Sequence, residues 1–366
     1  MSERVSRLIE LSKRLVWLAT KGLIIDLVLL DGELTNDGPN IRCLLVGSSL
    51  FLDDFKHRVY NMSIVEVRKW RMPIFLLPLY IRNHANKFDI CVSSLPSIYG
   101  LFLDRFASFK GNEFVEQIIE TSGGWDGLRK NISGTKRNLI NSFERKYNLE
   151  MKISTDLADL PFFYNRMFIP YIRTRFGPLA LYDSYEEIKR FFDEGMLMFI
   201  SKDGRPLAAA LCRLRGGNLL YTRAGVLDGD EKLVNCGVLT AVYYYQIKYA
   251  IENALKSLDV QGSRPYLNDG VYYHKATWGA CSRPDTKRSA VAVHYICTGP
   301  PTVIAHLFEA CPTIVQAGGG LRAIIGYTKN PEPSSAELAA AIKGYYLAGV
   351  KEVVFMTRTG QKILPI

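Results

Sequence analysis

The sequence predicts an α+β protein in which helices flank a mixed β-sheet. Residues 196–225 form three strand-like runs joined by Asp203-Gly204 and Gly216-Gly217, dipeptides that favour tight hairpin turns. A long apolar helix over residues 238–255 then leads into a further strand at 256–260. Hairpins make neighbouring strands antiparallel, whereas a helical crossover makes them parallel, so both kinds of pairing are expected in one sheet.

In the first part of the chain, the sequence predicts several helices and strands and one stretch without clear periodicity. A basic amphipathic helix is expected at the start, followed by two short strands and a loop-rich stretch that extends to about residue 111. A strand and two helices follow, the second of them strongly charged. The predicted ranges are helix 5–21, strands 23–30, 41–47 and 114–120, and helices 125–132 and 135–147.

From residue 149 the signals for helix ends become sharper. A strand at 149–154 is followed by a helix over 159–175 that should break near Pro170, which cannot donate a backbone hydrogen bond. Ser184 and Glu187 form the pattern of a capping box for a helix at 184–194, with Gly195 expected in the left-handed conformation at its end. A last strand of this sheet is predicted at 290–297.

The tail repeats this pattern. Strands are predicted at 321–327 and 350–356, and between them Ser334 and Glu337 form a second capping box for a helix that ends at Gly349. These strands are candidates to complete a sheet of the N-terminal region, although no pattern specifies the pairing. We therefore divide the chain into residues 1–112, residues 113–298 with a core at 149–298, and a tail at 299–366.

Composition narrows the class of protein. A chain of 366 residues exceeds one ordinary core, and a net charge of +10 favours anionic partners such as polyphosphate cofactors, nucleic acid or membrane surfaces. The seven cysteines form no C-x-x-C pair and are odd in number, which argues against a disulfide framework or a structural zinc site. Apolar runs are too short for a membrane span, so we expect a cytoplasmic protein without signal peptide or transmembrane helix.

Residues 258–280 carry the richest chemistry in the chain. Glycines at 262, 270 and 279 give the backbone freedom, and acidic, basic and hydrogen-bonding side chains are concentrated between them. A purely structural turn needs fewer ionisable groups, so this segment is our candidate site loop. Its polar residues are Asp259, Arg264, Asn268, Asp269, Tyr273, His274 and Lys275.

Three blocks of sequence together resemble one superfamily. They are GWDGLRKNISGTKRNLINSFERKYNLEMKI at 124–153, DEGMLMFISKDGRPLAAALCRLRGGNLLYTRAGVLDGD at 193–230, and the site loop that ends in YYHKATWGA. In this order and spacing they are similar to GNAT-type acyltransferases of the Fem-like and CelD-like branch, which resemble peptidoglycan aminoacyltransferases. The resemblance covers about residues 113–282 and implies a GNAT-like domain, with residues 1–150 and the tail as a degenerate first unit of a tandem pair.

The resemblance and the residue chemistry together give a set of catalytic candidates. Lys275 resembles the lysine that closes the Fem-like site loop, where its charge would neutralise a developing oxyanion or a donor phosphate, with a solvated surface charge as the structural alternative. Asp269, like Asp259, is a candidate base, with turn capping as the structural alternative. Tyr273 and His274 are candidates for a general acid or for the wall of an acceptor pocket, with ordinary packing as their alternative.

Donor binding is expected where residues 230–239 lead into the long helix. Backbone N–H groups at a helix start attract anions, so Lys232, Asn235, Gly237 and Val238 are the candidate cofactor-binding residues. The GNAT pyrophosphate loop usually reads Arg/Gln-x-x-Gly-x-Gly/Ala. Here only Gly237 matches its glycines, which weakens the expectation of coenzyme A and leaves aminoacyl-tRNA, or a plain helix start, as alternatives.

Charged residues outside the loop complete the site prediction. Arg223 lies in a central strand, where an unpaired charge is costly, so we expect it either to form a structural salt bridge or to bind substrate together with Arg264 and Asn268. Lys136 and Arg137 lie on a basic helix that would either contact tRNA phosphates or be a solvated face. We expect no metal site, since the five histidines are dispersed and no metalloprotease or phosphate-loop motif occurs.

The sequence thus predicts an acyltransferase that moves an acyl or aminoacyl group to an amine of a small molecule, peptide or cell-envelope precursor. No tightly bound cofactor is expected, and the donor is acyl-CoA or aminoacyl-tRNA. Two alternatives remain at this point. One is an acyl-CoA-dependent N-acetyltransferase, and the other is a non-catalytic basic RNA-binding or scaffold protein with the same fold.

Overall fold

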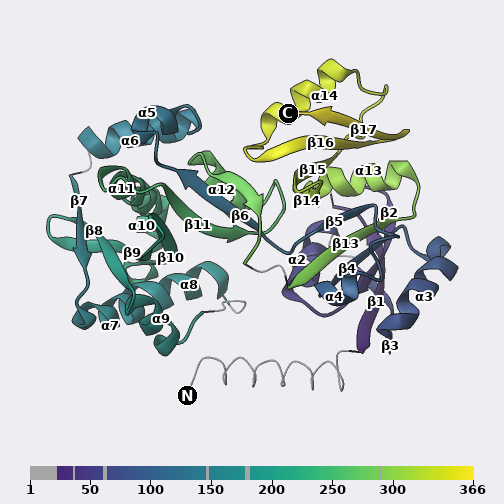
Figure 1. The fold of residues 1–366 in the computed structure, drawn as a ribbon, viewed down its shortest axis with the longest axis horizontal. Coiled ribbons are helices and arrows are strands. Elements are labelled where there is room, and N and C mark those ends of the chain that lie inside the picture. The colour runs from purple at the N-terminus through teal and green to yellow at the C-terminus, as the bar shows by residue number, and fades with distance from the viewer. Residues whose placement is uncertain (1–22, 36–37, 61–63, 146–147, 178–181, 288–289) are drawn as a thin grey trace. The chain divides into compact units, whose positions relative to one another are not determined.

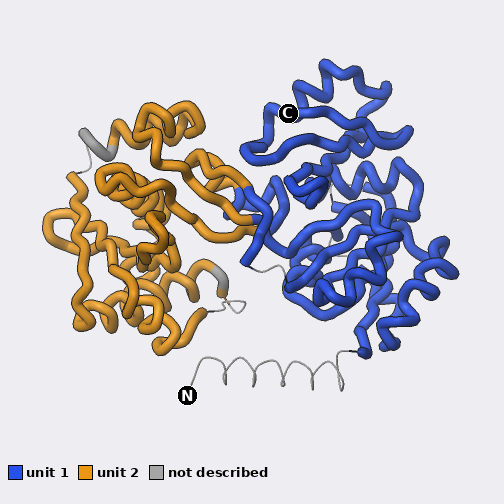
Figure 2. The backbone as a smooth tube through the Cα atoms, in the orientation of Figure 1, with its two compact units in different colours: residues 1–115, 264–272, 283–366 blue, residues 116–263, 273–282 orange. Residues whose placement is uncertain are grey.

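The structure is a computed structural model of the whole chain. It describes all residues except 1–22, 36–37, 61–63, 146–147, 178–181 and 288–289 (Figure 1). The helix predicted over residues 5–21 lies outside the described residues. Contacts divide the chain into two compact units, coloured separately in Figure 2. Unit 1 comprises residues 1–115, 264–272 and 283–366, and unit 2 comprises residues 116–263 and 273–282.

Unit 1 is built on a ten-stranded mixed sheet of order β17-β16-β15-β14-β5-β13-β4-β2-β1-β3. Strands β2 and β4 pair in parallel, as do β15 and β16, and the other recorded pairings are antiparallel. Its strands are β1 (Ile24–Glu33), β2 (Asn40–Val46), β3 (Val65–Pro73), β4 (Ile90–Pro96), β5 (Phe109–Gly111), β13 (Val291–Cys297), β14 (Thr313–Ala317), β15 (Gly320–Gly326), β16 (Val350–Thr357) and β17 (Gly360–Pro365).

Helices cover both faces of this sheet. Apolar side chains of α2 and α13 enter one core cluster, and those of η1 and α3, with Tyr99 of α4, enter a second. Both clusters include β2 and β4 residues, because successive side chains of a strand point to opposite faces. The helical elements are α2 (Leu50–Val59), η1 (Ile74–Leu76), α3 (Leu77–Asn83), η2 (Ala85–Lys87), α4 (Ser97–Gly100), α13 (Pro301–Ala310), α14 (Ser335–Ala341) and η7 (Ile342–Gly344).

Two expectations for unit 1 are wrong. The stretch expected to be loop-rich up to residue 111 instead holds α2, β3, α3, β4, α4 and β5. The strand at residues 291–297 does not close the sheet of the second region, because β13 pairs with β4 and β5 in the first sheet. Strands β14 to β17 of the tail also belong to that sheet.

Unit 2 is built on a seven-stranded mixed sheet of order β12-β6-β11-β10-β9-β8-β7. The meander β8–β9–β10 is antiparallel, and the crossover helix α11 brings β11 parallel to β10. These features confirm the predicted class of a mixed sheet flanked by helices. The strands are β6 (Val115–Glu120), β7 (Leu149–Ser154), β8 (Gly195–Lys202), β9 (Arg205–Arg215), β10 (Asn218–Val226), β11 (Ser257–Ser263) and β12 (Cys281–Pro284).

The helices of unit 2 lie against two cores that alternate along the strands. Met196 and Met198 of β8 enter the core with α11, whereas Leu197 and Phe199 enter the core with the helices before β8. The helical elements are α5 (Gly124–Arg129), α6 (Gly134–Arg145), η3 (Leu157–Asp159), α7 (Leu160–Phe162), η4 (Phe163–Phe168), α8 (Ile169–Phe176), α9 (Tyr185–Phe192), η6 (Leu227–Gly229), α10 (Glu231–Asn235), α11 (Val238–Glu252) and α12 (Gly270–Thr277), which starts in unit 1.

Local signals in the sequence match the structure at turns and helix starts. Asp203 and Gly204 both have positive φ, as do Gly216 and Gly217, which the predicted hairpin turns require. The capping boxes at Ser184 and Ser334 are both formed. The predicted break near Pro170 is present as a π-helical turn, η4, directly before α8.

The predicted ends of two helices are wrong. Gly195 does not adopt the left-handed conformation but begins β8, where a side chain would lie 2.6 Å from the carbonyl oxygen of Cys212. It is therefore needed for close strand packing rather than for a helix end. The tail helix ends at Ala341 rather than at 348, and Gly349 instead precedes β16 with a φ of 88°.

Candidate active site in the second unit

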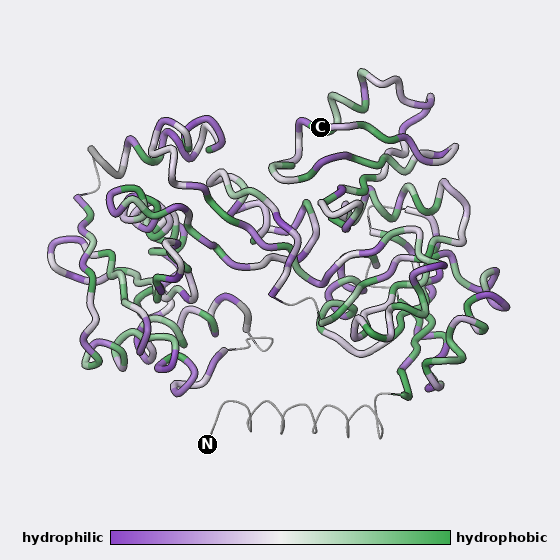
Figure 3. The backbone as a smooth tube through the Cα atoms, in the orientation of Figure 1, coloured by the Kyte–Doolittle hydropathy of each residue, from purple (hydrophilic) through white to green (hydrophobic). Residues whose placement is uncertain are grey.

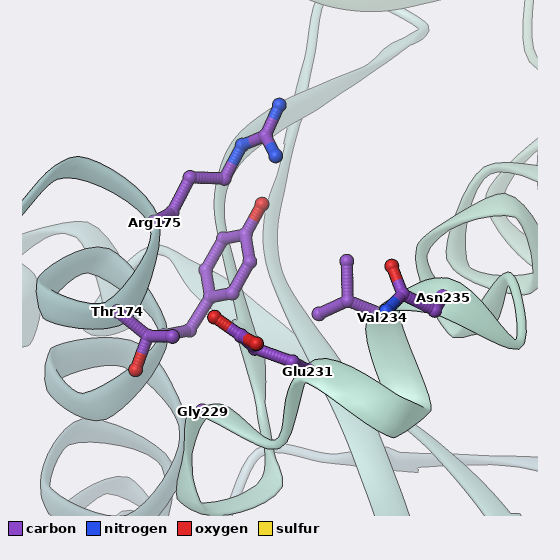
Figure 4. A pocket seen from close by; sticks show the side chains of 7 residues that line it. Thr174, Arg175, Gly229, Glu231, Val234 and Asn235 are labelled. Carbon is purple, nitrogen blue, oxygen red and sulfur yellow. The ribbon is translucent and has the colours of Figure 1, made fainter.

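A cavity of about 300 Å³ opens in unit 2 beyond the carboxyl end of β10 (Figure 4). Helix α8 forms one wall and the short helix α10 forms the other, with η6 between them. The cavity has the size of a small ligand pocket. Its lining residues are Tyr171, Thr174, Arg175, Gly229, Glu231, Val234 and Asn235.

The loop after β10 shapes this cavity. At Gly229 the backbone has a φ of 65°, and a side chain there would lie 2.7 Å from the carbonyl oxygen of Pro170. Only glycine therefore allows η6 to approach α8 so closely. Asp230 then caps α10, since its side chain accepts a hydrogen bond of 2.8 Å from the Lys232 backbone N–H. Gly237, with a φ of 86°, turns the chain into α11.

The cavity wall carries charges of both signs. Arg175 is an exposed guanidinium at the end of α8, and Glu231 is an exposed carboxylate in the first turn of α10. Figure 4 shows their side chains on opposite walls of the cavity. A guanidinium binds phosphate or carboxylate groups, whereas a carboxylate attracts an amine. The cavity is therefore suited to hold an anionic and a basic group side by side.

An aromatic cluster lies on α11 and α12 of the same unit. The Tyr243 ring stacks on Trp278 at 6.0 Å and meets the His274 imidazole edge-on at 4.9 Å. Tyr221 of β10 meets Tyr243 edge-on at 5.5 Å. The ammonium of Lys136 lies 5.3 Å from the centre of the Trp278 ring, where the ring's negative face attracts it.

His274 is held uncharged by this environment. Burial, and then the positive charges of Lys136, Lys275 and Arg175, lower the pKa of its imidazole from 6.5 to about 4. The same Arg175 lines the cavity, so the electrostatic field of the cavity reaches the aromatic cluster. His274 can therefore donate and accept hydrogen bonds at neutral pH, but it is a weak base.

Lys275 lies with its side chain buried beside β11. Its Nζ donates hydrogen bonds to the carbonyl oxygens of Gln261 at 3.2 Å and Gly262 at 2.9 Å. Gln261 has a φ of 65°, which is unfavourable for a residue with a side chain. The ammonium thus binds the backbone at a strained position within β11 and places a positive charge close to His274.

Three candidates from the site loop belong to unit 1 and have structural contacts there. Asp269 accepts hydrogen bonds of 2.9 Å from the backbone N–H groups of Val271 and Tyr272 and pairs with Arg58 at 2.6 Å. These are the bonds of a helix cap, the structural alternative for this residue. Asn268 donates to the carbonyl oxygen of Ala310 at 2.9 Å.

Arg264, the third of them, is largely buried between aromatic rings. Its guanidinium carbon lies 4.6 Å from the centre of the Phe114 ring and 5.7 Å from that of Phe51. Its Nε lies 3.8 Å from the Asp54 carboxylate. The segment predicted as one site loop is therefore divided, with Arg264, Asn268 and Asp269 in unit 1 and residues 273–282 in unit 2. Much of it is helix α12 rather than loop.

The remaining candidates differ in their surroundings. Arg223 forms a two-pronged ion pair with Asp183, one bond of which measures 2.9 Å, so its charge has a protein partner. Tyr273 is exposed. Of the predicted donor-binding residues only Asn235 lines the cavity, whereas Lys232 is exposed on α10 and Val238 is buried at the start of α11.

Sequence reasoning missed most of the cavity. Tyr171 and Glu231 come from helices outside the site loop, and nothing in their local pattern distinguishes them from surface residues. The paired basic residues of IRTRFG, Arg173 and Arg175, at the end of a helix before a glycine were a usable signal. A basic cluster at that point is more than the helix dipole requires.

No group of three or more His, Cys, Asp or Glu side chains within the described residues is arranged to hold a metal ion. None of the helices in the described ranges is long and apolar enough to cross a membrane.

Comparisons with known proteins found similar structures but no similar sequences. Neither a protein-family model nor a curated protein matches the chain. The crystal structure of FemX is 12% identical, with a TM-score of 0.41 over 76% of this chain and 86% of that chain. L-PGS from Bacillus licheniformis is 9% identical, with a TM-score of 0.36 over 76% and 87%. A GCN5-related N-acetyltransferase from Anabaena variabilis is 9% identical, with a TM-score of 0.30 over 90% and 74%.

Proposed function

We propose that this protein is an acyltransferase whose reaction takes place in unit 2, at the cavity between α8 and α10. It moves an acyl or aminoacyl group from an anionic donor to the amine of a small molecule, peptide or cell-envelope precursor. One observation carries the proposal: a single cavity of about 300 Å³ presents both the Arg175 guanidinium and the Glu231 carboxylate. It lies at the segment where the sequence resemblance implies donor binding, and Asn235 belongs to both.

The charges of the site fit such a donor. Arg175, Lys136 and Lys275 all act electrostatically on His274, so three positive charges surround this part of unit 2. The phosphates of coenzyme A or of a tRNA end would be attracted there. We assign Arg175 to the donor phosphate, because its guanidinium is exposed at the cavity, whereas Lys275 binds backbone carbonyls.

The reaction follows from these assignments. The acceptor nitrogen attacks the donor carbonyl carbon, the new C–N bond forms, and the bond to the leaving sulfur or oxygen breaks. Glu231 attracts the acceptor amine and takes its proton, and the leaving group receives a proton from solvent. His274 is uncharged at neutral pH and is not among the residues that line the cavity, so we assign the proton transfer to Glu231 by its position rather than by its strength as a base.

The donor remains to be chosen between acyl-CoA and aminoacyl-tRNA. Thermal unfolding with coenzyme A, acetyl-CoA and a mixed aminoacyl-tRNA pool separates the two, since a ligand selective for the native state raises the midpoint. Stabilisation by coenzyme A identifies an acyl-CoA enzyme. Stabilisation by charged tRNA alone, weakened by salt, identifies the Fem-like donor. A protein stabilised by neither contradicts the proposal.

The variant Arg175→Ala tests the cavity directly. Loss of a charge-assisted hydrogen bond to phosphate should lower the affinity of the protein for its donor about ten- to a hundredfold. Titration calorimetry with the donor that stabilises the wild type measures this change. Arg173→Ala is the matched control, because Arg173 is on the same helix and its guanidinium bonds the Tyr182 hydroxyl at 3.2 Å. Glu231→Gln should instead lower transfer at saturating donor. Equal affinities for the wild type and Arg175→Ala would disprove the assignment.

A further inference from the structure

Unit 1 carries a segment that is both apolar and basic. Residues 67–88 include five Lys or Arg side chains and no Asp or Glu, and they also include the run IFLLPLYI. The segment covers most of edge strand β3, then η1, α3 and η2. Figure 3 shows hydrophobic and hydrophilic stretches following each other directly along it. Large apolar patches are usually buried, so the degree to which this run is exposed shows whether it is part of the core or a binding surface.

The run packs only half of its apolar side chains. Leu77 and Ile81 of α3 enter the same core cluster as Tyr99 and Leu103, so α3, α4 and the turn after it cover one face of the sheet. Their neighbours in sequence face solvent instead. We call these six side chains the apolar outer surface: Phe75 (59% exposed), Leu76 (42%), Leu79 (56%), Ile98 (61%), Leu101 (66%) and Phe102 (46%).

Six large apolar side chains on one helical layer are costly to leave in water. Removing such a side chain from water is favourable in proportion to the apolar area that is covered. Isolated exposed leucines are ordinary, but several on neighbouring short elements are typical of a binding surface. The layer therefore has a strong tendency to bind an apolar partner.

The charges around the layer indicate which partner fits. Arg68 lies on the same face of β3 as the partly buried Trp70, with its guanidinium carbon 5.0 Å from the ring centre. Arg82 lies in the last turn of α3, Lys87 ends η2, and Arg105 follows α4. All four are exposed, and among the described residues none of them has a recorded ion pair. The partner should therefore be anionic.

We propose that the apolar outer surface of unit 1 docks on an anionic lipid bilayer. Short amphipathic elements bind at the boundary of headgroups and acyl chains by placing apolar side chains in the membrane and keeping Lys and Arg at the headgroups. Phe75, Leu76 and Leu79 would enter the membrane, while Arg82 and Lys87 would contact lipid phosphates. A lipid fits better than a protein, because Arg82 directly follows the apolar run and no Asp or Glu occurs in residues 67–88. In the second part of the surface, Asp104 follows Phe102 and is paired with Lys110.

Vesicle sedimentation of the full chain tests the proposal. The wild type should bind vesicles of phosphatidylcholine mixed with phosphatidylglycerol and bind pure phosphatidylcholine much more weakly. Phe75→Ser with Leu79→Ser should lower the ratio of bound to free protein at least about tenfold, since two apolar anchors are lost. Arg82→Gln with Lys87→Gln should lower it about tenfold on the charged vesicles alone.

Matched control variants distinguish binding through this surface from nonspecific binding by exposed apolar side chains. Leu214→Ser with Ile363→Ser removes two apolar side chains that are 53% and 56% exposed on β9 and β17, outside the layer, and should leave binding unchanged. Thermal unfolding of each variant checks that it folds. If the wild type does not bind the charged vesicles, the proposal is overturned and the surface is better explained by a protein partner. Equal losses in the Phe75/Leu79 variant and in the control overturn it as well.

Discussion

At the scale of single residues, His274 tests the electrostatics of the site. Lys136→Gln should raise the pKa of His274 from about 4 toward 6.5, because the charge of Lys136 is, after burial, the largest cause of the lowered pKa. An NMR titration of the imidazole measures the change. Lys248→Gln is the control, since Lys248 is a partly exposed lysine of α11 whose charge does not contribute to the lowered pKa of His274. A pKa that stays near 4, or that rises equally in both variants, would contradict this account.

The same lowered pKa makes stability depend on pH. Below pH 6.5 the unfolded chain binds a proton at His274, whereas the folded protein does so only near pH 4. The free energy of unfolding should therefore fall as the pH decreases between these values, by up to about 3 kcal/mol from this group. Above pH 6.5 both states are neutral at this position and the contribution is absent.

Residue chemistry in the sequence predicted the site only in part. His274 and Lys275 lie together with the positive charges of Lys136 and Arg175 in unit 2, and the catalytic roles expected for them stay a prediction. Asp269 has the contacts of a helix cap, a role that a carboxylate before glycine predicts equally well. That Arg175 and Glu231 line one cavity could not be predicted, because their proximity depends on how α8 packs beside η6.

At the scale of elements, close backbone contacts hold unit 2 together. Gly225 of β10 lies against η4, and a side chain there would approach the Met167 carbonyl carbon to 2.6 Å and the Phe168 nitrogen to 2.7 Å. Both atoms are backbone, so they cannot move aside as a flexible side chain would. Gly225→Ala should lower the free energy of unfolding by about 1–3 kcal/mol or more, measured by urea denaturation.

A second glycine provides the control. Gly127 is inside α5, and a side chain there would meet nothing within 4 Å. Gly127→Ala should therefore raise stability by up to about 1 kcal/mol, because alanine loses less backbone entropy in a helix. Equal free energies of unfolding for Gly225→Ala and Gly127→Ala would contradict the close packing of β10 on η4.

Elements whose limits depend on local chemistry were predictable. The hairpin turns require positive φ, and the capping boxes require a Ser and a Glu at fixed spacing, so both can be found in the sequence. The partner of β13 was not predictable, because an apolar strand of seven residues suits the interior of either sheet. Gly195 shows the same limit, since a glycine after a helix serves a left-handed turn and a close strand contact equally well.

At the scale of the whole molecule, the chain order and the units do not coincide. Unit 1 is assembled from the first 115 residues, a short internal segment and the last 84, so its core includes side chains from both ends of the chain. Leu307 and Phe308 of α13 and Ile324 of β15 lie in the same cluster as Phe51 and Phe55 of α2. Residues 299–366 are therefore part of the core of unit 1 rather than an appendage.

Truncation after Cys297 tests this organisation. It removes α13 and β14–β17, and each large side chain lost from the core costs about 1.5–3 kcal/mol. The sum exceeds the 5–15 kcal/mol that stabilises an ordinary domain, so unit 1 should not fold, as hydrogen exchange of β2 and β4 would show. Truncation after Thr359 removes only edge strand β17, which has no fully buried residue, and should keep that protection. Protected β2 and β4 amides in the shorter chain would mean that the core does not depend on the tail.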